Sequence, residues 1–210
     1  MPIRSIRFAA ALLASLALSS CTELVKNFEE MQKDDKDSRA AQLMRIADST
    51  RQGGDLKSAL ALYQRASSFA AEDLPPLIAI GDTAYQLGLH DLATKAYMQA
   101  TLIAPDNTKA HSGHGKALIA LGQPQQAMAQ FETVTGLAAD QYGGYNGLGV
   151  ALDLLGRHAE AQVQYRKALE ISPQTLSVLN NLALSLAIEG KFADALELLG
   201  PLQNDLSTAE

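Results

Sequence analysis

The sequence predicts an all-α solenoid built from five helix pairs. One pattern, Gly-x4-Ala-x3-aromatic-x2-Ala, recurs with a period of 34 residues. Spacings of three and four place its alanines and aromatic residue on one helix face, and glycine suits the turn before that helix. Periods of about 20 to 50 residues are typical of solenoids, whose units bury their apolar faces against one another. The copies begin at Gly54, Gly88, Gly122, Gly156 and Gly190, and the fifth is weaker, with Leu199 at the aromatic position.

The composition excludes several other classes of protein. The chain has 210 residues and a formal net charge of -6, with no Trp and a single Cys. An acidic chain is a poor match for the phosphate backbone of nucleic acids, so we expect no nucleic-acid partner. One cysteine can form neither an intramolecular disulfide framework nor a cysteine-based zinc site.

Residues 1–20 have the features of a signal peptide. Arg4 and Arg7 precede an apolar run that spans residues 8–18. This run is too short to cross a bilayer as a helix, which needs about 20 apolar residues. The following motif LSSC, which ends at Cys21, resembles the bacterial lipobox. The resemblance implies cleavage before Cys21 and lipidation of that residue, and two or more lipid chains give stable membrane anchoring. The alternative is a secreted protein with a chance cysteine.

The residue after the cysteine indicates the membrane. Thr22 stands where an aspartate favours inner-membrane retention in similar lipoproteins. We therefore expect a cell-envelope protein that is lipid-anchored at the outer membrane and faces the periplasm. Residues 21–39 are dense in charge of both signs, which predicts a flexible or partly helical tether.

The remaining residues, 40–210, resemble the tetratricopeptide repeat (TPR), a family of antiparallel helix pairs. The small residue at position 8 of that family is present in every unit, while its tryptophan at position 4 is missing throughout. The resemblance implies close helix packing at position 8. The five residues are Ala47, Gly81, Gly115, Gly149 and Ala183. The predicted units are 40–73, 74–107, 108–141, 142–175 and 176–209.

Two features could indicate chemistry rather than packing. His111 and His114 are spaced like metal ligands on one helix face, which leaves a metal-dependent enzyme as a remote alternative. Both stand at packing positions of the repeat and no carboxylate or cysteine completes a site, so we expect no metal, no cofactor and no catalytic residue. Gly143, Gly144 and Gly147 disfavour a helix by about 1 kcal/mol each relative to alanine. They suggest a locally soft helix, or a frayed first turn.

The resemblance also predicts a partner-binding groove, because positions 2, 5, 9 and 12 of the first helix line the concave face in this family. We expect it to bind a partner segment, whereas the alternative is that the tail after Leu199 or a second copy covers it. The candidate residues are Met44, Asp48, Ile78, Tyr85, Lys109, Ile119, Asn146, Val150, Asn180 and Leu184.

The lipobox, the short tether and the repeats together resemble the TadD-like lipoproteins of tight-adherence (Flp/Tad) pilus assembly. The stretch from Arg45 to Ala66 carries part of that resemblance. It implies a non-enzymatic scaffold, similar to a pilotin, that helps a pilus secretin localise or assemble. The alternative is a general envelope scaffold that binds cell-wall enzymes or the outer-membrane protein assembly machinery.

Overall fold

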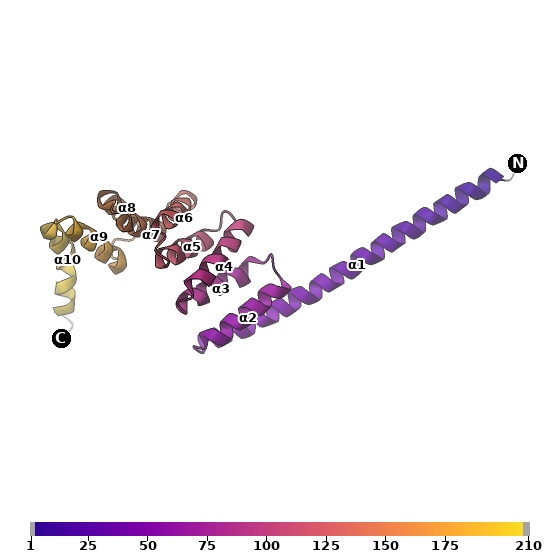
Figure 1. Cartoon of the computed structure of the whole chain (residues 1–210), viewed down its shortest axis with the longest axis horizontal. Helices are drawn as coiled ribbons and strands as arrows, with labels where there is room; N and C mark the ends of the chain where they lie inside the picture. Colours follow the sequence, from indigo (N-terminus) through magenta and orange to yellow (C-terminus); the bar gives the residue numbers. More distant parts are fainter. Residues whose placement is uncertain (1–2, 208–210) are drawn as a thin grey trace.

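The described part of the chain is entirely helical, which confirms the predicted fold class. The computed structural model describes residues 3–207, with side chains for residue 26 and for residues 29–200. The helices stack side by side into an arch, with α1 at one end and α10 at the other (Figure 1). They are α1 (Ile3–Gln52), α2 (Leu56–Phe69), α3 (Leu74–Gln86), α4 (His90–Ile103), α5 (Thr108–Ala120), α6 (Pro124–Leu137), α7 (Tyr142–Leu154), α8 (His158–Ile171), α9 (Leu176–Ile188) and α10 (Phe192–Ser207).

Helix α1 is much longer than the others. Only its C-terminal part lies against α2, and the remainder projects beyond the arch (Figure 1). The tether expected at residues 21–39 is helical throughout, and the side chains of residues 29–39 are exposed. The side chain of Cys21, the predicted lipidation site, lies outside the described residues. Among the described residues, no helix has a stretch long and apolar enough to cross a membrane.

Each helix pair is closed by a glycine in the left-handed region, as the pattern predicts. Gly54, Gly88, Gly122, Gly156 and Gly190 have φ between 69° and 89°. At Gly88 the backbone N–H donates to the carbonyl of Tyr85 at 3.0 Å, and the Leu89 N–H donates to Ala84 at 2.9 Å. Glycine adopts this backbone conformation without the steric penalty of a Cβ, so the turn can be tight.

Buried aromatic rings connect each pair to its small residues. Tyr97 and Phe131 are almost fully buried. A Cβ built on Gly81 would lie 2.7 Å from the ring of Tyr97, and one built on Gly115 would lie 2.8 Å from that of Phe131. Position 8 is therefore small because the ring of the same unit fills the space of a side chain.

Gly144 and Gly147 of α7 have a packing role that the sequence analysis did not predict. A Cβ on Gly147 would lie 2.2 Å from Phe131, and one on Gly144 would lie 2.8 Å from Val134. Gly113 stands in the same relation to Tyr97, at 2.3 Å. Position 6 of the next unit thus closes the second side of the ring. Gly143 is the exception in α7, because a Cβ built on it would have nothing within 4 Å.

Candidate partner-binding groove

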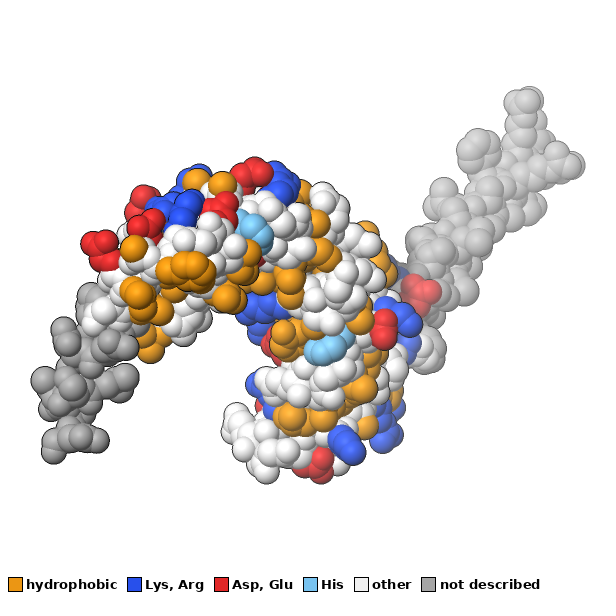
Figure 2. All heavy atoms as spheres, turned by 60° about the vertical axis from the view of Figure 1, so that its left-hand side comes forward, with side chains coloured by type: hydrophobic (Ala, Val, Ile, Leu, Met, Phe, Trp, Pro, Cys, Tyr) orange, Lys and Arg blue, Asp and Glu red, His pale blue; other side chains and the backbone are white. Residues whose placement is uncertain are grey.

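The concave side of the arch is lined by the first helices of successive pairs. Figure 2 shows this hollow, with basic and hydrophobic side chains facing it. Two adjoining hollows share Tyr85 and Lys116 and together run from α3 across α5 and α7 to the start of α9. We call them the central groove. Its lining includes Asp82, Tyr85, Gln86, Lys109, Ser112, Lys116, Ile119, Tyr142, Asn146, Val150 and Ser177.

Half of the predicted groove residues meet in this central groove. They are Tyr85, Lys109, Ile119, Asn146 and Val150. Met44 instead lines a hollow near the start of α3, together with Pro75 and Pro76. Asn180 and Leu184 line a separate apolar hollow between α9 and α10.

The prediction for Ile78 is wrong. This side chain is only 8% exposed and belongs to the N-terminal core cluster, where Leu77 and Ile80 are also buried. The equivalent residues of the next two units, Ser112 and Asn146, are half-buried and line the central groove. An isoleucine at this position is drawn into the core because its burial is favourable, whereas serine and asparagine stay at the surface.

Tyrosine hydroxyls fix the acidic residues of the first two units. Tyr97 donates to Asp82 at 2.6 Å, and Tyr63 donates to Asp48 at 2.6 Å. Burial, followed by the bond to Asp48, raises the pKa of Tyr63 to about 12. Burial likewise raises the pKa of Tyr97. Both phenols therefore stay protonated, and each donates a hydrogen bond that fixes the position of an aspartate carboxylate.

The third unit breaks this pattern, and a cation takes the place of the aspartate. Phe131 has no hydroxyl, and Lys116 stands at the position that Asp82 occupies one unit earlier. Lys109 pairs with Asp82 at 2.9 Å. Among the described residues, no carboxylate lies within ion-pair distance of Lys116, whose side chain is exposed in the groove. The centre of the groove thus presents an available positive charge beside Tyr85.

Asp153 connects the three helices α7, α8 and α9. It accepts hydrogen bonds from Tyr165 at 2.9 Å, from His158 at 2.9 Å and from Ser185 at 2.7 Å. The donors lie on α8 and α9, so one carboxylate on α7 ties its own pair to the next. The sequence alone does not identify this residue. Asp153 stands three repeat positions later than Asp48 and Asp82, the aspartates of the first two units.

Comparisons with known proteins agree with this architecture. Residues 75–107, 112–175 and 175–200 match family models described as tetratricopeptide repeats. Residues 75–200 belong to the tetratricopeptide repeat family. No curated protein matches the sequence. The TPR assignment confirms the family resemblance of the repeats, and it supports a scaffold for protein–protein interaction.

Solved TPR structures share the fold at low sequence identity. MamA from Desulfovibrio magneticus RS-1 is 19% identical, with a TM-score of 0.74 over 82% of this chain and 97% of that chain. A second MamA structure is 21% identical, with a TM-score of 0.70, and the match covers 77% of this chain and 88% of that chain. A thermophilic TPR protein from Thermus thermophilus is 20% identical, with a TM-score of 0.64, and the match covers 77% of this chain and 89% of that chain. These similarities show the fold alone.

The fold accounts for His111 and His114, the two histidines with metal-ligand spacing. The ring of His111 lies 2.8 Å from Oε1 of Gln130 through Nδ1 and 2.9 Å from the carbonyl oxygen of Pro105 through Nε2. Both ring nitrogens are therefore engaged, and a metal would have to displace one of these bonds. His114 is buried, and this burial lowers its pKa. The described residues contain no cluster of three metal-ligating side chains.

Proposed function

We propose that the protein is a scaffold that binds a segment of a partner protein in the central groove. The observation that carries the proposal is a continuous row of side chains from α3, α5 and α7 that line the groove, with Lys116 at its centre. Residues on rigid helices hold such a surface in a fixed shape, so a partner segment meets it with little loss of conformational freedom.

The chemistry of the groove favours an extended segment with both acidic and apolar side chains. Lys116 offers a positive charge, and Tyr85, Tyr142, Ile119 and Val150 offer apolar surface on either side. A carboxylate near Lys116 would form a charge-assisted hydrogen bond in a partly enclosed site. The neighbouring apolar surface would bind the flanking side chains.

Charge reversal at the groove tests this proposal. Lys116→Glu should reduce co-purification of the partner from the cell envelope by at least tenfold, because the groove would then repel an acidic segment. Lys95→Glu is the matched control, since Lys95 is an exposed lysine on α4 that lines neither hollow. Equal recovery of the partner by both variants and the wild type would contradict the groove as the binding site.

We further propose that Cys21 carries a lipid anchor and holds the domain at the periplasmic face of the outer membrane. The lipobox supports this location, and the helix between Cys21 and Ala40, whose side chains are exposed over residues 29–39, supplies a spacer of roughly 30 Å at 1.5 Å per residue. Cys21→Ala should release the protein into the soluble periplasmic fraction. An unchanged membrane fraction would contradict the anchor.

Within this proposal, the partner is a component of tight-adherence pilus assembly, with the secretin as the first candidate. The support is the resemblance of the lipobox, tether and repeats to that lipoprotein family. Deletion of the protein should leave the secretin unassembled or outside the outer membrane, and Lys116→Glu should reproduce the defect. A secretin that assembles normally without the protein would point instead to a general envelope scaffold.

A further inference from the structure

The last helix pair ends in an apolar surface. We call it the end face, and it consists of the residues that line the hollow between α9 and α10. Phe192 is 63% exposed, Leu196 is 70% exposed and Leu184 is 62% exposed. Figure 2 shows hydrophobic side chains gathered at this end of the described solenoid. The end face comprises Asn180, Ala183, Leu184, Ala187, Phe192, Ala195, Leu196 and Leu199.

In the first and fourth units, the counterparts of Phe192 and Leu196 are buried or half-buried. In the first unit Leu56 is half-buried and Leu60 is buried, and Leu60 packs in the core cluster that contains Leu77 of α3. Gln162 in the fourth unit is 2% exposed. Its amide donates to Glu189, just after α9, at 2.8 Å. At the repeat positions of Phe192 and Leu196, these two units are therefore packed against a following helix.

An exposed apolar surface of this kind favours association with another surface. The other end of the described solenoid is more polar. Its outward row on α1 has Gln42, Arg45 and Ile46 exposed. A second copy could not continue the solenoid through this end without burying Arg45.

We propose that the end face is a homodimer interface, in which two copies pack tail to tail about a twofold axis. A twofold contact requires one surface to be complementary to itself. The end face has a ridge, formed by Phe192 and Leu196, beside a groove with a floor of Ala183 and Ala187. Each copy can therefore place its ridge in the groove of the other.

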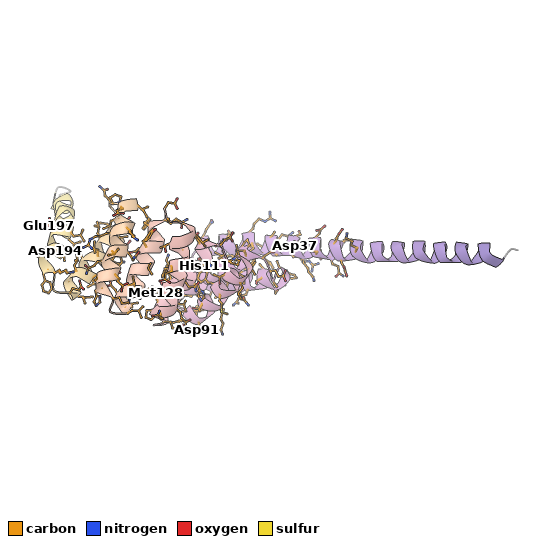
Figure 3. All side chains as sticks on the ribbon, turned by 90° about the horizontal axis from the view of Figure 1, so that it is seen from above. Asp37, Asp91, His111, Met128, Asp194 and Glu197 are labelled. Carbon is orange, nitrogen blue, oxygen red and sulfur yellow. The ribbon has the colours of Figure 1, made fainter. Side chains whose placement is uncertain are left out.

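The charges are compatible with this contact. The residues of the end face carry no charge, so the twofold axis brings no like charges together at its centre. The acidic residues of α10, Asp194 and Glu197, do not line it, and they lie at the opposite end of the molecule from Asp37 (Figure 3).

The exposed apolar area of the end face is most of the apolar area that a standard interface buries on each partner. Large apolar side chains that are about two-thirds exposed present roughly 100 Å² each, so Leu184, Phe192 and Leu196 present roughly 300–400 Å² on each copy. A standard interface buries about 800 Å² on each partner, of which a little over half, about 450 Å², is apolar. Three side chains supply most of that apolar area.

The dimer would leave the central groove free. Tyr85, Lys116 and Asn146 lie on α3, α5 and α7, away from the end face. Two grooves in one assembly could bind a multimeric partner at two points, which raises the overall affinity without any new contact to each partner segment. The homodimer does not depend on the identity of that partner.

Analytical ultracentrifugation of the full chain carrying Cys21→Ser tests the homodimer. The wild-type end face should give a concentration-dependent mass of twice 22.3 kDa. Phe192→Asp combined with Leu196→Asp should weaken dimerisation at least 100-fold, since each substitution occurs twice in a twofold contact. Leu102→Asp, at a side chain that is 74% exposed on α4, should leave it unchanged. Circular dichroism should show the same helix content for all three.

A cysteine cross-link distinguishes the twofold contact from other contacts. With Cys21 replaced by serine, Leu196→Cys introduces the only thiol, and oxidation should give a covalent dimer. Leu102→Cys should remain monomeric under the same conditions. A monomer at all concentrations would overturn the proposal and leave the end face to a different protein. A dimer that survives the double aspartate substitution, or that forms no Leu196→Cys cross-link, would also overturn it.

Discussion

Substitution by alanine should change the free energy of unfolding in opposite directions at two glycines of α7. Gly143→Ala places a methyl group where nothing lies within 4 Å. Gly147→Ala places it 2.2 Å from the ring of Phe131. That ring cannot retreat, because it is buried and a Cβ on Gly115 would lie only 2.8 Å from its other side.

The magnitudes follow from two opposing effects. Alanine favours a helix over glycine by about 1 kcal/mol in the interior, and by less in the first turn. Overpacking a core costs about 1–3 kcal/mol, and the enclosed ring places Gly147→Ala at the upper end. We therefore expect Gly147→Ala to lower the free energy of unfolding by about 2 kcal/mol and Gly143→Ala to raise it by about 0.5 kcal/mol.

Thermal unfolding followed by circular dichroism provides the assay. For a domain of this size, 1 kcal/mol shifts the Tm by about 2–4 °C. Gly147→Ala should lower the Tm by about 4–8 °C, and Gly143→Ala should raise it by about 1–2 °C. A Gly147→Ala variant as stable as the wild type would refute the close approach of α7 to Phe131, and would restore the view of these glycines as a soft point.

Two further predictions concern buried polar groups. Tyr97→Phe removes the bond to Asp82 and should lower the free energy of unfolding by about 1–2 kcal/mol. Tyr63→Phe should lower it less, since the Asp48 side chain is 47% exposed and water can replace the phenol; equal losses in urea titrations would contradict that reasoning. Burial lowers the pKa of His114, so the unfolded chain takes up the proton first and stability should fall as the pH drops below 6.5. His114→Gln should flatten this slope in unfolding titrations from about pH 7.5 to 5.5, and an unchanged slope would show that another group causes it.

The period of the sequence predicts the helix pairs because each unit needs the same turn and the same small residues. Gly88 and Gly81 are examples, since a positive φ and a ring at van der Waals distance each leave a visible mark in the sequence. The period cannot show which neighbouring unit supplies the ring, so helix propensity alone makes Gly147 a weak helix residue. The period also predicts which positions lie on the concave face, but it does not predict how far each side chain is buried. The prediction for Ile78 is wrong for that reason.

The candidate site was partly predictable for a related reason. Repeat positions bring Tyr85, Lys109 and Asn146 to one side of the arch, and the structure places them there. Hydrogen bonds between helices are not periodic, so the roles of Asp82 and Asp153 could not be derived from spacing. The available charge of Lys116 became visible only when its neighbours were known.

Site-specific photo-crosslinking in the cell envelope tests the central claim most directly. A photoreactive amino acid in place of Gln86 should form an adduct with one partner protein, because this exposed side chain lines the central groove and its replacement keeps the charge of Lys116. The same amino acid in place of Leu102, which is exposed outside the groove, should form none. An adduct of equal yield at both positions, or none at Gln86, would contradict the central groove as the binding site.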